Sequence, residues 1–278
     1  MNPDKGIQRM VWSRQDVGIT ASVRQRNDLL IHTFVTDQPA LVFLRRGRKT
    51  VIAGSREIVL SPGDAVAIAP GTVCDVRNET ERGQFESTWI VFANPILSSL
   101  EKLFPDHQRL KGAAPLAKFG SEFLQSFERA SQAIVLPDSI PDTVAAHRMQ
   151  ELLAWLAHAG LVFSSEASSD LRWKVRLMIG THPEKIWTAA DLAHRFAMSP
   201  ATFRRCLADQ GQSFNEILID VRMTTALTLL QVTDLPVVQI AFQVGYQSAS
   251  RFSDRFKRRF GFSPSAVRDE PAQTAHPM

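Results

Sequence analysis

The sequence predicts two domains: an N-terminal all-β domain with following helices, and a C-terminal all-α domain with two helix-turn-helix units. Short β-type runs separated by turn residues fill residues 29–93, helical periodicity follows, and residues 188–264 contain one motif twice. A chain of 278 residues, of which 44% are apolar, can form two separate cores.

The β-type runs are short and closely spaced, which favours a sandwich or barrel over alternating β-α-β units. Two turns, Ser61-Pro62-Gly63-Asp64 and Pro70-Gly71, bracket one of the runs. This arrangement resembles the turn pattern of cupin barrels. We therefore expect an N-terminal all-β cupin-like barrel, with helices at its C-terminal end, over residues 1–160.

Two helices are predicted after the β region, over residues 119–134 and 144–160, because apolar side chains recur there every three or four positions. The second helix carries an apolar stripe, which is a candidate dimerisation surface. Packing of the same stripe on its own β domain is the open alternative. A Ser-rich run then predicts a linker over 161–170, with the C-terminal domain over 171–270. The stripe consists of Met149, Leu152 and Leu156.

The internal repeat gives each copy an alanine, a small residue four positions later, a serine, and then two large apolar residues at steps of four. The alanine lets two helices cross closely, the small residue allows a sharp turn, and the serine caps the second helix. Each copy therefore predicts helix, tight turn, helix. The positions are Ala193, Ala197, Ser199, Phe203 and Leu207 in the first copy, and Ala241, Gly245, Ser248, Phe252 and Phe256 in the second.

The second helix of each copy has a free side with basic groups, and the net charge of +4 lies in residues 170–278. Such side chains can reach base edges in the major groove, and those on the flanks can meet phosphates. Two ordinary helical hairpins with solvated faces are the alternative. The candidate DNA-binding residues are Ala201, Thr202, Arg204 and Arg205 in the first copy, and Ser248, Ser250, Arg251, Asp254, Arg255, Lys257 and Arg258 in the second.

Between the copies, residues 214–232 predict one long helix. It would span about 28 Å at roughly 1.5 Å per residue. A rod of this length can hold two recognition helices about one DNA turn, roughly 34 Å, apart. One chain is therefore expected to read two successive segments of the major groove.

These features together resemble the AraC/XylS family of bacterial transcription regulators. The resemblance implies promoter binding beside RNA polymerase, commonly activation, and an N-terminal cupin-like domain that senses an effector or dimerises. The matching residues are Trp187, Leu192, Ala193, Met198, Ser199, Phe203, Arg205, Gly211, Ser213, Phe214, Arg222, Ala226, Leu229, Leu230, Ile240, Ala241, Val244, Gly245, Tyr246, Ser248, Ser250, Arg251, Phe252, Phe256, Lys257, Phe260, Gly261, Phe262, Ser263, Pro264 and Arg268.

The chain departs from the usual family pattern at two places. The interval from Ser199 to Gly211 is one residue shorter, which resembles the subgroup of virulence and acid-response regulators, some of which bind fatty acids. Asp254 stands where the family often has arginine, so it either accepts from a cytosine amino group or fixes a neighbouring arginine. Arg222 is interpreted as a structural partner of a carboxylate.

The N-terminal domain lacks the histidine pattern of a metal-dependent cupin enzyme, because only His32 of seven histidines lies in the β region. Cys74 is interpreted as a packed thiol. We therefore expect no catalytic residue, metal or cofactor, and a domain that binds a small-molecule effector. The candidate effector-binding residues are His32, Arg45, Arg46 and Lys49.

The sequence therefore favours a transcription regulator, expected to be an activator, that responds to a small-molecule effector. Control by a partner protein, and an enzyme with a DNA-binding tail, are the alternatives. The expected partners are double-stranded operator DNA, RNA polymerase, the effector and a second copy in a homodimer. With two cysteines in no paired pattern and no apolar run of membrane length, a cytoplasmic location without membrane association is expected.

Overall fold

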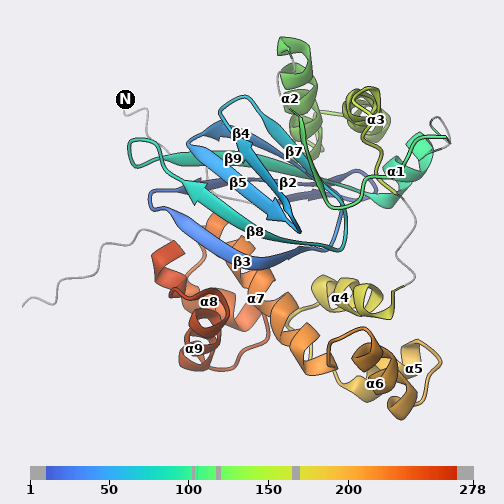
Figure 1. The fold of residues 1–278 in the computed structure, drawn as a ribbon, viewed down its shortest axis with the longest axis vertical. Helices are drawn as coiled ribbons and strands as arrows, with labels where there is room; N and C mark the ends of the chain where they lie inside the picture. The colour runs from blue at the N-terminus through green and yellow to red at the C-terminus, as the bar shows by residue number, and fades with distance from the viewer. Residues whose placement is uncertain (1–10, 102–103, 105, 117–119, 165–169, 268–278) are drawn as a thin grey trace, which may run out of the picture. The chain divides into compact units, whose positions relative to one another are not determined.

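The computed structural model describes residues 11–101, 104, 106–116, 120–164 and 170–267. These residues form two compact units, one mainly before and one mainly after residue 167. The first unit contains the β-strands and three helices, and the second contains the C-terminal helices (Figure 1).

The strands of the first unit form two sheets, which confirms the all-β prediction. Their hydrogen-bond pairing does not join the described strands into one closed barrel. The six-stranded sheet has the order β1 (Trp12–Arg14), β2 (Gly18–Gln25), β9 (Phe85–Phe92), β4 (Ala40–Arg46), β7 (Ala65–Ile68) and β10 (Ala113–Leu116). The four-stranded sheet has the order β3 (Leu29–Thr36), β8 (Thr72–Glu79), β5 (Arg48–Ala53) and β6 (Arg56–Leu60).

Both turns that resemble the cupin pattern are present. Gly63, with φ 97°, and Gly71, with φ 75°, adopt the left-handed backbone that only glycine accepts readily. The Asp64 carboxylate accepts a hydrogen bond from the Ser61 backbone N–H at 2.9 Å. These turns place β7 between β6 and β8 in the chain, as expected.

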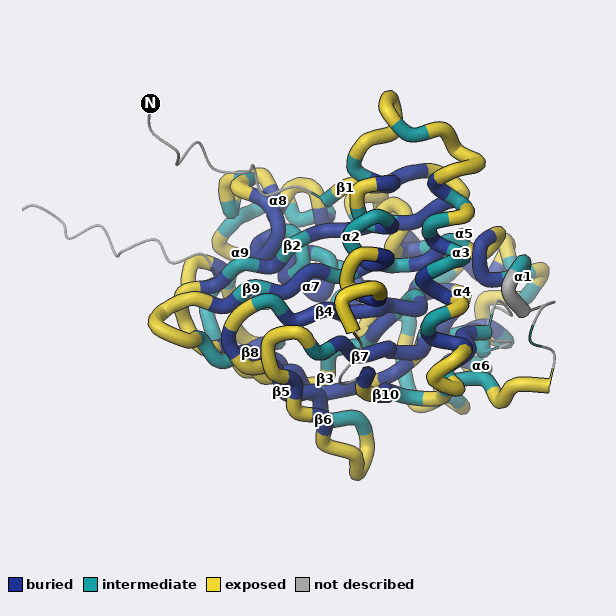
Figure 2. Tube along the Cα trace, turned by 90° about the horizontal axis from the view of Figure 1, so that it is seen from above, coloured by how far each residue is buried: buried dark blue, intermediate teal, exposed yellow. Residues whose placement is uncertain are grey.

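Three helices accompany the first unit: α1 (Asn94–Glu101), α2 (Ser121–Val135) and α3 (Asp142–His158). The helix predicted over 119–134 is α2, and Phe119 lies outside the described residues. Phe127 of α2 packs on Phe43 of β4 with ring centroids 5.3 Å apart. Figure 2 shows the run of buried residues along β4 and the alternation of buried and exposed residues along the helices.

The apolar stripe of α3 is buried in the core of its own unit. Met149, Leu152 and Leu156 each have 0% exposure and belong to the cluster formed with α2 and the six-stranded sheet. Side chains without exposed surface cannot form a contact with a second chain. The assignment of this stripe to dimerisation was therefore wrong, and packing on its own β domain is what the structure has.

The predicted linker over 161–170 begins inside the first unit. Val162 and Phe163 are buried, and Val162 forms a β-bridge with Arg109. The described start of this segment therefore packs in the N-terminal core. Residues 165–169 of the predicted linker lie outside the described residues.

The second unit has the helices that the repeat predicts. The spacing of Thr188 and Asp191 predicts a capping box at the start of the first motif, and the two side chains form one. Gly261, with φ 84°, ends the last helix of the second motif in the left-handed conformation. The residues that cap these helices could therefore be identified from sequence alone. The helices are α4 (Leu171–Thr181), α5 (Ala189–Arg195), α6 (Pro200–Asp209), α7 (Phe214–Val232), α8 (Val237–Gln243) and α9 (Ala249–Phe260), followed by a 3-10 turn (Pro264–Val267).

A helix that spans a membrane must be both long and predominantly apolar. Within residues that the structure describes, no helix meets both conditions.

Candidate nucleic-acid interface

Two helices, α6 and α9, are the second helices of the two helix-turn-helix units. Each begins at a serine whose hydroxyl accepts from a backbone N–H three residues later: Ser199 from Thr202, and Ser248 from Arg251. The crossing alanines, Ala193 of α5 and Ala241 of α8, are fully buried. The close crossing and the caps therefore fix where each helix starts and how it is oriented.

The buried face of each helix is set by large apolar side chains. Phe203 and Leu207 of α6 are fully buried against α4, α5 and α7. In α9, Phe256 packs on Phe252 and Phe260, with ring centroids 5.7 and 4.8 Å apart. The opposite side of each helix is consequently turned to solvent.

The candidate residues of α6 lie on this solvent side. Ala201, Arg204 and Arg205 are exposed, and Thr202 is half-buried. The Thr202 hydroxyl lies 2.9 Å from the Ser199 hydroxyl, so it takes part in the N-terminal cap. Thr202 therefore has a local structural role besides any contact with DNA.

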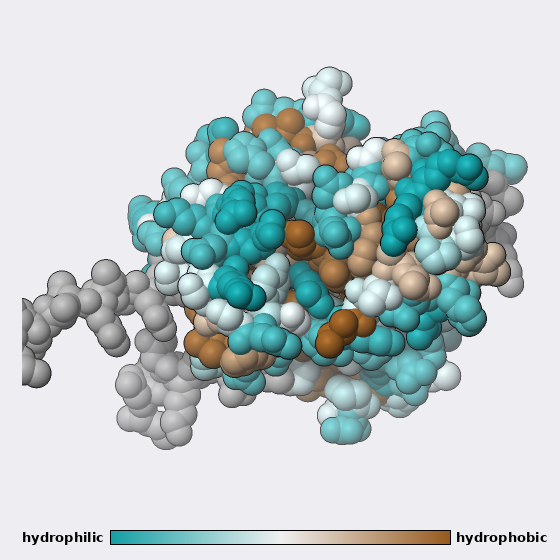
Figure 3. Space-filling view, turned by 90° about the horizontal axis from the view of Figure 1, so that it is seen from below, coloured by the Kyte–Doolittle hydropathy of each residue, from teal (hydrophilic) through white to brown (hydrophobic). Residues whose placement is uncertain are grey.

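The candidate residues of α9 also lie on its solvent side, where basic side chains predominate. Hydrophilic residues likewise predominate on the face drawn in Figure 3. In total, this side of α9 offers four cations and one carboxylate. Ser250, Arg251, Asp254, Lys257 and Arg258 are exposed, and Ser248 and Arg255 are half-buried.

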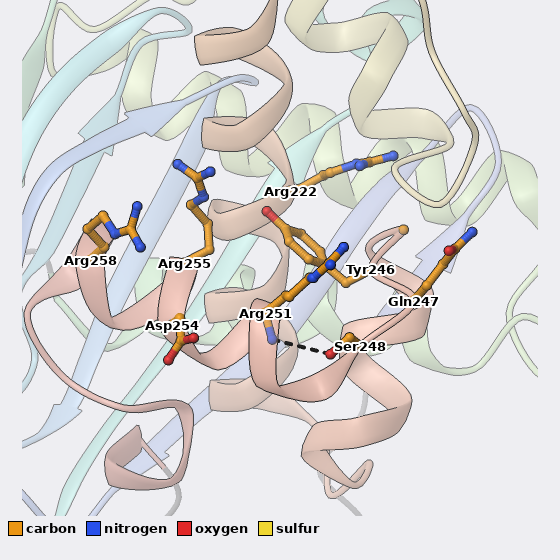
Figure 4. A pocket seen from close by; sticks show the side chains of 9 residues that line it. Arg222, Tyr246, Gln247, Ser248, Arg251, Asp254, Arg255 and Arg258 are labelled. Carbon is orange, nitrogen blue, oxygen red and sulfur yellow. Dashed lines mark hydrogen bonds between the residues drawn. The ribbon is translucent and has the colours of Figure 1, made fainter.

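A pocket of about 440 Å³ opens beside α9 (Figure 4). Arg255 and Arg258 extend from α9 on one side of it, and Tyr246 and Arg222 lie opposite. Burial raises the pKa of Tyr246 against the opposing influence of Arg255 and Arg222, so its hydroxyl stays protonated. The pocket can therefore receive an anionic group. Its lining residues are Arg222, Gly245, Tyr246, Gln247, Ser248, Arg251, Asp254, Arg255 and Arg258.

A buried ion-pair network joins α4 and α9 to the long helix α7. Asp220 of α7 accepts from Arg176 of α4 at 2.7 Å and from Arg259 of α9 at 2.8 Å. The exposure of these side chains is 14% for Asp220, 3% for Arg176 and 17% for Arg259. One carboxylate thereby links α4, which packs on the first helix-turn-helix motif, to the second recognition helix.

A second link runs through Arg222, two residues further along α7. Its guanidinium donates to the backbone carbonyls of Pro183 and Lys185, each at 2.9 Å. Both hydrogen-bond acceptors are main-chain oxygens, so the expected carboxylate does not accept these bonds, and Glu184 acts on the half-buried Arg222 through its charge alone. The guanidinium also lies where a side chain on Gly245 would be: a Cβ there would be 2.5 Å from Arg222 Nη2. Arg222 therefore holds the turn of the second motif against the segment that precedes the first.

Sequence reasoning identified Arg222 but missed Asp220, Arg176 and Arg259. The available signal was an acidic residue, Asp220, inside the apolar-periodic stretch 214–232, whereas Glu216, the other acid there, lies in the first turn. Such a residue is buried only when it is paired. The sequence does not show which of its many arginines supplies the pairing.

The candidate effector residues of the first unit do not come together. Arg45 forms an ion pair with Glu128 of α2 at 2.6 Å, and Arg46 is exposed. His32 is 59% exposed and contacts Asp75 at 2.8 Å. A common effector site made of these three residues and Lys49 is therefore not present.

Lys49 differs from the other three candidates because it is buried. It is 7% exposed, donates to the Asn78 side-chain oxygen at 2.6 Å, and lies 5.4 Å from the centre of the Phe85 ring. Burial lowers the pKa of Lys49 to about 8. The neighbouring Cys74 is 2% exposed, and burial raises its pKa to about 11, so it is a packed thiol as predicted.

A metal ion in a protein is usually held by three or more His, Cys, Asp or Glu side chains that lie close together. The part of the chain that the structure describes contains no such group.

The C-terminal region is similar to the helix-turn-helix domains of known transcription regulators. A helix-turn-helix domain family matches residues 192–270. The urease operon transcriptional activator of Escherichia coli is 37% identical over 100 residues, which are 36% of this chain and 34% of that protein. The regulator GadX of Escherichia coli O6:H1 is 29% identical over 104 residues, 37% of this chain and 38% of GadX. The chain thus spans about a third of the length of these relatives.

A solved structure matches most of the chain. ToxT from Vibrio cholerae superposes with a TM-score of 0.65 at 13% identity, over 90% of this chain and 97% of ToxT. At this identity the match shows the fold: an N-terminal β domain with helices and a C-terminal helix-turn-helix domain.

Ala197 and Gly245 occupy equivalent turns of the two motifs, and their substitution should have different effects on the free energy of unfolding. Gly245→Ala should lower the free energy of unfolding by about 1–2 kcal/mol or more, because φ is +81° and the new Cβ would meet Arg222 and the Pro183 carbonyl. Ala197→Gly should leave it unchanged or raise it by up to about 1 kcal/mol, because Ala197 already has φ 53° and is exposed. Chemical unfolding followed by circular dichroism measures both. Equal stability of Gly245→Ala and the unsubstituted protein would contradict this packing.

Proposed function

We propose that this chain, a member of the AraC/XylS family of helix-turn-helix regulators, controls transcription by binding one operator with both α6 and α9. This proposal is supported mainly by one observation: each of the two helices buries its apolar side and leaves its polar and basic side exposed. Arginine side chains on such a surface can contact guanine edges, and flanking cations can neutralise phosphates.

The predicted DNA contacts divide into two classes by their place on the helices. Arg251 is exposed near the start of α9, and Arg204, Arg205 and Asp254 are exposed near the middle of their helices; all four are proposed to read bases. Lys257 and Arg258 lie towards the end of α9 and are proposed to bind phosphates, together with Arg255 at the pocket. The remaining candidates, Ala201, Thr202, Ser248 and Ser250, shape the helix starts.

Activation next to RNA polymerase is the proposed mode of control. It is supported by the likeness of the C-terminal region to the urease operon transcriptional activator. The domain limits proposed for this activity are 171–270 for the DNA-binding domain and 1–160 for the N-terminal domain, extended to at least Phe163, which packs in its core. The dimerisation surface on α3 is not proposed again, because its residues are buried.

The N-terminal domain is proposed to sense a carboxylic acid through Lys49. A buried cation beside a neutral amide is costly without an anionic partner, and Lys49 has this environment. ToxT, which shares the fold, has been solved with an unsaturated fatty acid and with a methylnaphthalenyl-butenoic acid. A carboxylate bound at Lys49 would supply the missing counter-charge.

The two classes of DNA contact predict different binding defects. Arg251→Ala or Arg204→Ala should reduce the preference for the operator over random DNA, because base contacts carry the discrimination. Lys257→Ala should weaken both kinds of DNA alike and lower the slope of log K against log salt by about one unit. Titrations of operator and random duplexes at several salt concentrations measure this, with exposed Lys174→Ala of α4 as the matched control. Equal losses on both duplexes for Arg251→Ala would argue against a base contact.

The pKa of Lys49 predicts a stability change with pH. Its folded pKa, about 8, lies below the ordinary value of 10.5. Between these pH values the unfolded chain binds more protons, so burial of Lys49 becomes less costly as pH rises, by on the order of 3 kcal/mol in total. Lys49→Met should therefore be more stable than the unsubstituted protein at pH 7, and this advantage should shrink above pH 8.

The same variant tests the proposed effector. At pH 7, oleate should raise the melting temperature of the unsubstituted protein and of the exposed-lysine control Lys111→Met, but not of Lys49→Met. An oleate-induced shift of equal size in Lys49→Met would show that this amine does not bind the carboxylate.

A further inference from the structure

The two recognition helices carry opposite charges at one equivalent position. Arg205 follows the capping Ser199 by the same interval as Asp254 follows Ser248. Each also comes two positions after the fully buried aromatic residue of its helix, so at about 100° per residue it points almost directly away from the core. Both side chains are exposed. The repeat therefore places a donor-only group in one helix where the other has an acceptor-only group.

The carboxylate of Asp254 is not used to hold a neighbouring arginine. Among the described residues, no ion pair involves Asp254, although four arginines line the same pocket. Figure 4 shows Asp254 directed away from the guanidinium groups of Arg255 and Arg258. Of the two roles open to Asp254 from the sequence, accepting a hydrogen bond from a base therefore remains.

The surrounding cations explain how α9 could approach DNA in spite of this carboxylate. A lone exposed carboxylate facing a duplex is repelled by the phosphates. Arg251, Arg255 and Arg258 flank Asp254 along one side of α9 and keep the local charge positive. The helix can thus be attracted by phosphates while a negative group remains at the centre of its outer face.

In the major groove, the bases differ in what they offer to these two groups. Guanine presents two acceptors, which suit the paired donors of arginine, whereas cytosine presents the N4 amino donor, which suits a carboxylate. Adenine presents its N6 donor beside the N7 acceptor, which would repel a carboxylate oxygen. A carboxylate that faces guanine or adenine is left unpaired near an acceptor. It therefore disfavours these bases as well as favouring cytosine.

We propose that Asp254 determines specificity by reading a cytosine, whereas Arg205 reads a guanine at the equivalent place in the other segment. This inference rests on the proposed DNA-binding function. It implies that the two operator segments are not copies of one another, although the two protein motifs are. It also implies that Asp254 lowers affinity for DNA in general and raises selectivity.

The test is selection of binding sites from random duplex DNA by the full chain and by Asp254→Asn, Asp254→Arg and Asp254→Ala. Asparagine binds adenine and arginine binds guanine, so the preferred base should change from cytosine to adenine or guanine at one position only. Asp254→Ala should lose about 5- to 150-fold in preference for cytosine there, the equivalent of one good base contact.

Binding to random DNA gives an independent readout with a matched control from the repeat. Asp254→Ala should bind random DNA more tightly than the unsubstituted chain, because a negative charge has been removed. Arg205→Ala should bind it more weakly, because a positive charge has been removed. A merely structural role for Asp254 would not produce this opposite pair of changes.

The outcomes separate the inference from the function on which it rests. If the unsubstituted chain selects no sequence, the proposed function is overturned and the inference with it. If it selects an operator and the Asp254 variants select the same one at every position, only the inference is overturned.

Discussion

The double ion pair at Asp220 is the interaction on which the DNA-binding unit depends. Its carboxylate lies in the middle of α7 and is shared by Arg176 of α4 and Arg259 of α9, so both halves of the unit are fixed to one helix. Because Arg176 is almost fully buried, loss of the carboxylate would cost about 3–5 kcal/mol, as is typical when one partner of a buried pair is removed. Arg222 adds a second connection, through main-chain carbonyls and the glycine turn of the second motif.

This attachment determines how the exposed sides of α6 and α9 can meet DNA. A recognition helix on a flexible connection could adjust to many spacings between DNA segments, whereas one held by buried charges presents its side chains at a fixed place. The polar and basic sides then act as one surface, in which Arg205 and Asp254 occupy equivalent positions with opposite chemistry. Specificity in this account comes from the difference between the two motifs, and their similarity supplies the common framework.

The sequence was sufficient for features determined over a few residues. The caps at Thr188, Ser199 and Ser248 and the turn at Gly245 could be predicted, because each depends on the chemistry of adjacent positions. Periodicity also identified the apolar face of α3, but periodicity does not say what covers a face, and so a second chain and the chain's own β domain both stayed open until the structure showed the latter. Long-range pairs such as Arg45 with Glu128 depend on how strands and helices pack, which local sequence does not encode.

The central claim is that α6 and α9 are held at a fixed distance from each other. It is tested most directly by changing the spacing between the two operator segments. Binding of the full chain should be compared on the selected operator and on versions with about 5 or about 10 base pairs inserted between the segments, that is, half a helical turn or one turn. The account predicts that both insertions reduce affinity to that for a single segment, because α7 cannot lengthen. Retention of full affinity with either insertion would contradict it.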